Sequence, residues 1–422
     1  MAELSSAVVS RSLTDSGVDF DEASDRYGTA LVGAAFLGSF SGVQMLLDQG
    51  ADMNAVGGTY GTAMTAAVST WRRCIDIITL LLDRGADINT PGGDYGTPLA
   101  AAAFKGKMDV LSLLLDRGAN VNAVGGIYGT ALAAAAFKGA KDIVLRLLDR
   151  GADIHTVGGV YGTALGAAAF SGEVDTMTLL LDRGANINAV GGEFGTALSV
   201  TALTEHTLYG PPKSMTLLLN KNADINAVGG EYGSPLAVAA FQGNMKAALF
   251  LLHRAADIHA GGDKYGSALP VAAFYNRMEI AQLLLDQGAD INVAGSKYGT
   301  ALAAAAFNGH MDIVLMLLER GADIKAVDSK YGTAVAAAAF GGHTDLVSLL
   351  LERGAPIDVN IKTVGDGENM DIVAQLLEHG ADVICARGSY STPSGVYFPP
   401  YFISMFAFGS HNGENQVCIQ VR

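Results

Sequence analysis

Residues 121–154 read Val-Asn-Ala-Val-Gly-Gly-Ile-Tyr-Gly-Thr-Ala-Leu-Ala-Ala-Ala-Ala-Phe-Lys-Gly-Ala-Lys-Asp-Ile-Val-Leu-Arg-Leu-Leu-Asp-Arg-Gly-Ala-Asp-Ile, and most of the chain repeats this stretch with small changes. Its clearest marker is an aromatic residue before Gly-Thr or Gly-Ser, found at Tyr27, Tyr60, Tyr95, Tyr128, Tyr161, Phe194, Tyr232, Tyr265, Tyr298 and Tyr331. Most steps between these markers are 33 residues long, and the two exceptions are 35 and 38. A fixed period of this length predicts a stacked repeat protein.

A single repeat contains one turn and two helices. Residues 90–96 are rich in Gly, Pro and Asp, so the chain is expected to reverse there. Thr97 is a good N-cap for a first helix at 98–104, which is nearly all alanine and allows close packing. A second helix is predicted at 108–116; it is apolar over most of its circumference, as in a helix packed between neighbours. Gly118 supplies the left-handed residue that ends it.

The composition excludes several classes of partner. A net charge of −15 argues against nucleic acid, because phosphates must be neutralised by clustered Lys and Arg. The chain has no apolar run long enough to span a membrane and no charged leader at its start. Three widely spaced cysteines form neither a disulfide framework nor a metal motif. These features predict a cytoplasmic protein, with the nucleus as a second location, and no cofactor.

The repeat resembles the ankyrin repeat. Residues 95–103, Tyr-Gly-Thr-Pro-Leu-Ala-Ala-Ala-Ala, are similar to the family's Gly-x-Thr-Pro-Leu-His-x-Ala-Ala. Residues 113–122, Leu-Leu-Leu-Asp-Arg-Gly-Ala-Asn-Val-Asn, are similar to its Leu-Leu-Leu-x-x-Gly-Ala-Asp-Val-Asn. The resemblance covers residues 22–388, in ten full repeats and a shortened one. It implies an all-α repeat fold: a solenoid of stacked helix-turn-helix repeats with projecting hairpin turns.

The chain departs from the family pattern in two ways. Small residues replace the usual His after Leu, as at Ala100, Ala133 and Gly166. The usual Asp-x-x-Gly hairpin becomes Gly-Gly-x-Tyr-Gly, a variant similar to the ankyrin arrays of filamentous fungi.

The resemblance divides the chain into three parts. Residues 1–21 are a partial N-terminal repeat or a cap, 22–388 form the array, and 389–422 are an aromatic-rich, divergent tail that we expect to serve as a cap. Extra residues interrupt the period near residues 69–73 and at 205–212. Such insertions map to loops, which are either functional or simply tolerated on the surface.

By resemblance, partners are expected on the hairpin tips and on the exposed side of the first helices. The tips are Thr59, Asp94, Ile127, Val160, Glu193, Glu231, Lys264, Lys297 and Lys330. Two apolar tips are followed by two acidic and then three basic ones. This order would fix the direction of a partner, because charge contributes register more than affinity. Alternatively, the tips are solvated and have no role.

Aromatic residues form a second candidate surface. The first helices end in Phe36, Phe104, Phe137, Phe170, Phe241, Phe274, Phe307 and Phe340, nine residues after the aromatics that include Tyr128, Tyr161, Tyr232 and Tyr265. Counted along a helix, nine residues span about 13 Å. The two sets would then wall a trough whose exposed floor is Ala100, Ala133, Gly166, Ser199, Ala237, Ala303 and Ala336. Alternatively, each ring packs on the next repeat and fills space left by alanine.

Two functions remain open. The first is a non-catalytic scaffold, expected to be monomeric, that binds a protein or peptide along its concave face. The second is a small-molecule binder or enzyme that uses the aromatic trough, with residues 205–212 as a lid. The compact acid–base cluster of Glu205, His206 and Tyr209 lies in that lid. We identify no catalytic, cofactor-binding or metal-binding residue from any motif.

Overall fold

The computed structural model describes residues 28–70, 73–204, 213–262, 264–294, 299–327, 332–356, 372, 375–376, 406–411 and 414–419. The chain folds as two compact units, residues 1–230 (unit 1) and 231–422 (unit 2). In both units the described helices form short antiparallel pairs, which confirms the predicted all-α repeat architecture.

The inner helices follow directly from the repeated Thr/Ser-Ala/Pro-Leu stretch. At α6, Pro98–Lys105, the Thr97 side chain accepts from the Ala100 N–H at 3.1 Å and satisfies a donor that the first turn leaves unpaired. Gly106 then ends the helix at a positive φ of 72°. Four consecutive alanines in this helix, residues 100–103, are at most 1% exposed. An inner helix is thus buried on all sides over its central turns.

The inner helices of unit 1 are α2 (Ala30–Phe36), α4 (Ala63–Ser69), α6 (Pro98–Lys105), α8 (Ala131–Phe137), α10 (Ala164–Ser171) and α12 (Ala197–Thr201). Its outer helices are α3 (Phe40–Asp48), α5 (Cys74–Asp83), α7 (Met108–Asp116), α9 (Lys141–Asp149), α11 (Val174–Asp182) and α13 (Lys213–Asn220). In unit 2, the inner helices are α14 (Pro235–Gln242), α16 (Ala268–Phe274), α18 (Ala301–Phe307) and α20 (Ala334–Phe340). The outer ones are α15 (Met245–His253), α17 (Met278–Asp286), α19 (Met311–Glu319) and α21 (Thr344–Glu352).

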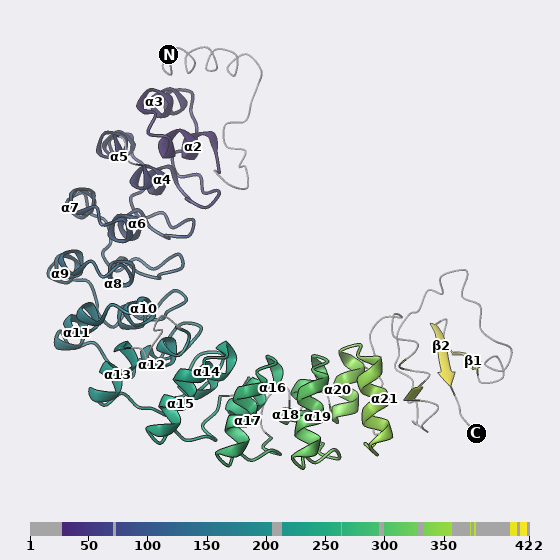
Figure 1. The fold of residues 1–422 in the computed structure, drawn as a ribbon. Coiled ribbons are helices and arrows are strands. Elements are labelled where there is room, and N and C mark those ends of the chain that lie inside the picture. Colours follow the sequence, from purple (N-terminus) through teal and green to yellow (C-terminus); the bar gives the residue numbers. More distant parts are fainter. Residues whose placement is uncertain are drawn as a thin grey trace. The chain divides into compact units, whose positions relative to one another are not determined.

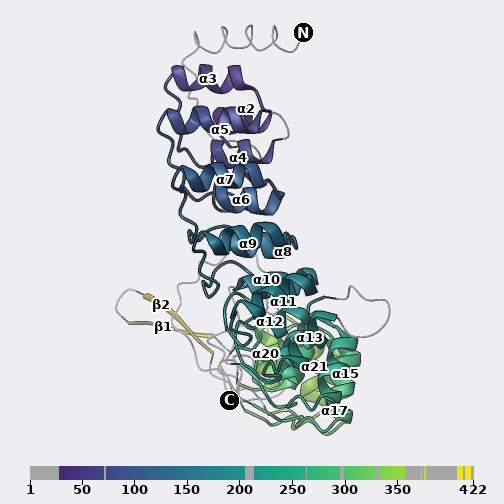
Figure 2. The same ribbon diagram turned by 90° about the vertical axis from the view of Figure 1, so that its left-hand side faces the viewer.

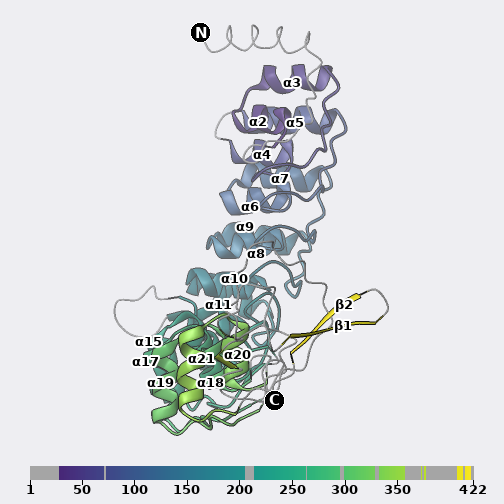
Figure 3. The same cartoon turned by 90° about the vertical axis from the view of Figure 1, so that its right-hand side faces the viewer.

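Within unit 1, inner and outer helices form two parallel rows, and the hairpins project from the inner row (Figure 1). Figure 2 views unit 1 from the side of the outer helices, which lie one above another. In unit 2, α15, α17 and α19 form the corresponding outer row (Figure 3). The outer helices bury one stripe each: in α7, Val110, Leu111 and Leu114 are fully buried. The core therefore lies between the two rows.

Inter-repeat polar contacts on the outer side were not predicted. Arg84 Nη1 lies 2.8 Å from Asp48 Oδ1, and Arg117 Nη1 lies 3.1 Å from Asp83 Oδ1, each in the preceding repeat. Asn122 Oδ1 likewise accepts from the Asp153 N–H of the next repeat at 2.8 Å. Each exposed ion pair contributes little, about 0–1 kcal/mol, but the contacts recur from repeat to repeat.

Several predicted features fall outside the described residues. They include the proposed N-terminal cap at 1–21 and the insertion at 205–212. Beyond α21, Ile372, Gln375 and Leu376 are helical, within the outer helix expected for the shortened repeat. The tail expected to be a cap contains β1, Phe406–His411, and β2, Glu414–Ile419, which pair antiparallel. The helical repeat pattern gave no sign of this pairing.

Candidate functional site: hairpin tips and the aromatic row

The hairpin tips of unit 1 are joined to one another through the main chain. The Asp94 N–H donates to Thr59 O at 3.0 Å, and the Ile127 N–H donates to Asp94 O at 2.8 Å. The same bond joins Val160 to Ile127 at 2.8 Å and Glu193 to Val160 at 3.0 Å. Five tips are therefore fixed in one line without any use of their side chains.

Glycines allow the hairpins to approach this closely. Gly96 has a φ of 78°, and a Cβ built on it would lie 2.2 Å from the carbonyl carbon of Gly125 in the next repeat. Gly126 shows the reverse relation, since its Cβ would lie 2.3 Å from the Gly96 nitrogen. The Gly-Gly-x-Tyr-Gly sequence, which departs from the family pattern, is thus what a tight hairpin stack requires.

The tip side chains differ from one another in their availability. In unit 1, Thr59, Asp94, Ile127 and Glu193 are exposed, and Val160 is half-buried. In unit 2, Glu231 is exposed but its carboxylate lies 2.6 Å from Lys264 Nζ. This hydrogen bond raises the pKa of Lys264, whose ammonium also lies over the Tyr265 ring, 5.1 Å from its centroid. Lys297 and Lys330 lie outside the described residues, so the expected order of tip charges stays a prediction.

The two sets of aromatic residues form one row, not two walls. The centroids of Tyr95 and Phe104 are 5.2 Å apart, and Phe104 lies 4.9 Å from Tyr128 of the next repeat. Tyr128–Phe137, Phe137–Tyr161 and Tyr161–Phe170 continue the row at 5.0, 5.5 and 4.6 Å. The expected separation of about 13 Å along a helix is wrong, because the tyrosine belongs to the hairpin and the chain reverses after it.

The predicted open trough is therefore wrong as well. Its floor is buried: Ala100 is 1% exposed, Ala133 2% and Ala237 0%. Gly166, Ser199, Ala303 and Ala336 are also buried. The rings lie against each other and against the rings of the next repeat, as the alternative interpretation held.

Two lysines lie over the row in unit 1. Lys105 Nζ is 5.0 Å from the centroid of Tyr95 and 5.7 Å from that of Phe104. Lys138 Nζ, one repeat further, is 5.1 Å from the centroid of the same Phe104. Both lysines are exposed at the inner-helix ends. They place positive charge over the rings of Tyr95 and Phe104.

In unit 2 the aromatic rings are covered by a residue that the repeat pattern did not single out. Tyr275 follows Phe274, where other repeats have residues such as Lys105, Ser171 or Gly341. The Tyr275 hydroxyl donates to the Tyr265 hydroxyl at 2.9 Å, and its ring lies 4.7 Å from Phe241. Tyr232 and Tyr265 are only 6% exposed, whereas Tyr128 and Tyr161 are half-buried. The sequence offered one signal for this contact, which is a tyrosine at a position that is small or polar in most other repeats.

Burial in the row changes the acidity of its phenols. It raises the pKa of Tyr128 to about 12, with smaller contributions from Tyr161, Tyr95 and Asp94 nearby. Burial also raises the pKa of Tyr161. In unit 2, burial and the hydrogen bond to Tyr265 raise the pKa of Tyr275. These phenols therefore stay protonated beyond the pH at which a free tyrosine ionises.

This shift predicts alkaline destabilisation. The unfolded chain releases the Tyr128 proton near pH 10, and the folded chain releases it near pH 12. Between these values the folded state binds more protons than the unfolded state. The contribution of Tyr128 to the free energy of unfolding is therefore fully present below pH ~10 and is lost as the pH rises toward ~12. The free energy of unfolding, measured with urea across this pH interval, should fall less steeply with pH in Tyr128→Phe than in the wild type. Identical slopes would contradict the assignment.

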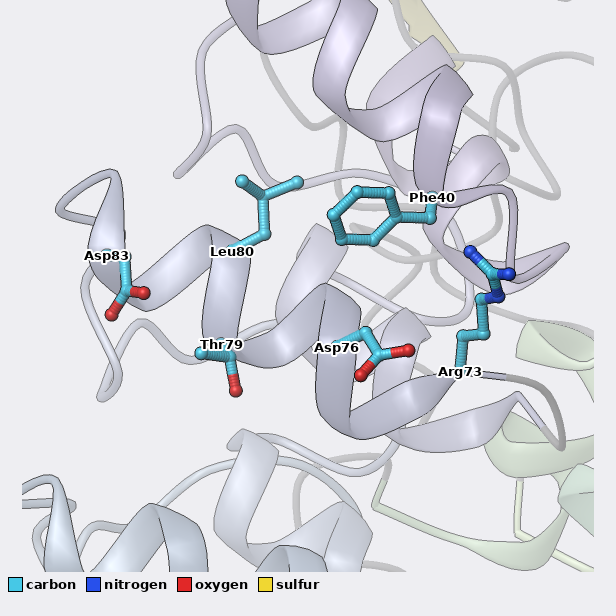
Figure 4. A pocket seen from close by; sticks show the side chains of 6 residues that line it. All are labelled: Phe40, Arg73, Asp76, Thr79, Leu80 and Asp83. Carbon is cyan, nitrogen blue, oxygen red and sulfur yellow. The ribbon is translucent and has the colours of Figure 1, made fainter.

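A hollow lies on the outer side of unit 1, away from the tips. It encloses about 370 Å³ and is lined by Phe40, Arg73, Asp76, Thr79, Leu80 and Asp83 (Figure 4). Phe40 begins α3, and the other residues come from α5 or precede it. Arg73, within the insertion expected near residues 69–73, has a φ of 46°. This hollow is separate from the tips and the ring row.

Two histidines of the array contact the main chain of the preceding repeat. His310 Nε2 lies 3.0 Å from Phe274 O, and His343 Nε2 lies 3.1 Å from Phe307 O, each in the preceding repeat. The cluster of Glu205, His206 and Tyr209 lies outside the described residues. Within the part that the structure describes, no group of three His, Cys, Asp or Glu side chains is placed to hold a metal ion. Among those same residues, every helix is too short or too polar to traverse a bilayer.

Comparison with known families accounts for this arrangement. The family model described as ankyrin repeats (3 copies) matches residues 64–158, 203–295, 236–328 and 269–363, and the one described as ankyrin repeat matches residues 162–192. A search of curated proteins finds no match. Ankyrin repeats generally mediate protein–protein interactions, and proteins built from them are typically non-enzymatic. Because these matches cover more than half of the sequence, the chain belongs to the ankyrin repeat family.

Proposed function

We propose that this chain is a non-catalytic scaffold that binds a protein or peptide along its concave face, formed by the hairpin tips and the aromatic row. The observation that carries the proposal is the line of main-chain hydrogen bonds between the tips. These bonds position each tip whatever its side chain is. The side chains of Asp94, Ile127 and Glu193 are therefore free to contact a partner.

The aromatic residues support the same surface. Of those predicted to bind a partner, Phe104, Phe137, Phe170, Tyr128 and Tyr161 lie in the unit 1 row, and Tyr232, Phe241, Tyr265, Phe274 and Phe307 lie in unit 2. The unit 1 rings remain half-exposed after packing. Half-exposed aromatic rings are common anchors in protein interfaces because they offer a large apolar area with few rotamers to fix. The alternative of a small-molecule trough has no open floor to support it.

The test compares two variants with the same change in charge. Asp94→Lys/Glu193→Lys alters the tips, and Asp109→Lys/Asp149→Lys alters exposed positions on the outer helices α7 and α9. The full-length chain and both variants are used to capture proteins from a lysate, with quantitative mass spectrometry as the readout. We expect captured proteins to be lost with the tip variant and retained with the outer variant. Equal capture by the two variants would contradict the proposal.

A further inference from the structure

We propose that the unit 1 row from Tyr95 to Phe170 receives an amphipathic helix with acidic residues along one edge, supplied by a protein partner. This inference rests on the proposed scaffold function and specifies the partner's chemistry. It depends on three observations: the occupied main-chain groups of the tips, the width of the ring row, and the two lysines that lie over its rings.

The tips cannot pair with an extended peptide. The N–H groups of Asp94, Ile127 and Val160 all donate to the preceding tip, and their carbonyl oxygens accept from the following one. A peptide strand added here would find no main-chain partners on these residues, and strand addition depends on such bonds. A helix satisfies its own backbone internally, so it can lie on this surface without that loss.

The dimensions of the row also fit a helix. Rings of equivalent residues repeat at 6.1 Å for Phe104–Phe137, 6.0 Å for Phe137–Phe170 and 6.3 Å for Tyr128–Tyr161. Successive turns of a helix are about 5.4 Å apart. The row is also two rings wide, because phenylalanine and tyrosine alternate across it. The apolar face of a helix, with residues at i, i+3, i+4 and i+7, is similarly two residues wide.

The two lysines specify which charge the partner helix should carry beside its apolar face. The ammonium groups of Lys105 and Lys138 both lie over Phe104, at 5.7 and 5.1 Å from its centroid. Two positive charges at one ring repel each other, and a carboxylate between them would relieve this and hydrogen-bond to both. The positive region is short, because Glu173 of the next repeat lies beside Gly139. The acidic residues of the helix should therefore face Lys105 and Lys138.

Unit 2 does not offer the same site. Tyr275 covers the rings there, leaving Tyr232 and Tyr265 only 6% exposed. Its tip lysine, Lys264, is already paired with Glu231 at 2.6 Å. The inference therefore concerns unit 1 alone.

The probe is a fluorescein-labelled peptide of about 16 residues, roughly 24 Å long as a helix, with leucine at i, i+3, i+4 and i+7 and glutamate along one flank. A second peptide replaces each glutamate with lysine, and a third carries one proline at its centre. Binding to the full-length chain is followed by fluorescence anisotropy at low ionic strength. We expect the acidic peptide to bind at least tenfold more tightly than either of the others.

The protein variants reverse the same charges. Lys105→Glu/Lys138→Glu should bind the lysine peptide in preference to the acidic one, whereas Lys141→Glu/Arg146→Glu on outer helix α9 should behave as the wild type. An unchanged preference in the first variant would overturn the inference, and so would full binding of the proline peptide or no binding of any peptide. The scaffold proposal is tested separately: it stands if the tip variant loses its captured proteins while these peptides fail.

Discussion

Replacing Gly96 with alanine is expected to destabilise unit 1 by about 2–5 kcal/mol. Gly96 has a φ of 78°, which costs an L-residue about 1–2 kcal/mol, and its new Cβ would lie 2.2 Å from the Gly125 carbonyl carbon. A flexible side chain could move aside, but this neighbour is the main chain of the adjacent hairpin. The hairpins would have to separate, and the tip hydrogen bonds would weaken with them.

A matched control separates the clash from the backbone conformation. Gly118 has a φ of 89°, similar to that of Gly96, but a Cβ built on it has no neighbour within 4 Å. Gly118→Ala should therefore cost only about 1–2 kcal/mol. Urea unfolding gives the stability of both variants, and hydrogen exchange shows whether protection is lost at residues 92–96 and 125–129. An equal cost for the two substitutions would mean that the hairpins do not approach as closely as described.

Replacing Leu114 with alanine is expected to cost about 2–5 kcal/mol. The leucine lies in α7 and is 0% exposed, so its truncation removes buried apolar area and leaves a cavity between the inner and outer helices. Each repeat is stabilised by its neighbours, so the loss should also weaken protection in the adjoining repeats. Denaturant unfolding measures the effect.

The adjacent residue provides the control for this substitution. Leu113 is half-buried in the same helix, so Leu113→Ala should cost about 1 kcal/mol and leave no enclosed cavity. The sequence alone did not distinguish the two, because it predicted only that α7 is apolar over most of its circumference. A cost for Leu113→Ala equal to that for Leu114→Ala would contradict the packing described.

The helices and hairpins were predictable because local signals coincide in most repeats. Thr97 caps a helix, Gly106 and Gly118 end helices, and most repeats carry the same residue types at these positions, although Asn222 and Ala255 take the place of Gly118 in two of them. The second helix at 108–116 has the predicted bounds, and the first helix extends one residue past its predicted end. These features depend on residues close together in the chain, which a sequence displays directly.

Contacts between repeats were harder to predict. The position of a tyrosine ring depends on how the hairpin folds back, and this places Tyr128 beside Phe104 of the preceding repeat, where an open trough was expected. The partner of Arg117 is Asp83, in the preceding repeat, not the adjacent Asp116. The burial of the aromatic rings in unit 2 depends on Tyr275. Its role becomes clear only from the hydrogen bond that its hydroxyl donates to the Tyr265 hydroxyl.

The main-chain line through Thr59, Asp94, Ile127, Val160 and Glu193 has an evolutionary consequence. Because an N–H and a carbonyl are common to every residue except proline, these sites can exchange one side chain for another without loss of the bonds that hold them. The binding specificity of the tips can therefore change by single substitutions, while the fold constrains residues elsewhere in the repeat. Duplicated repeats can diverge in what they recognise and remain interchangeable as building blocks.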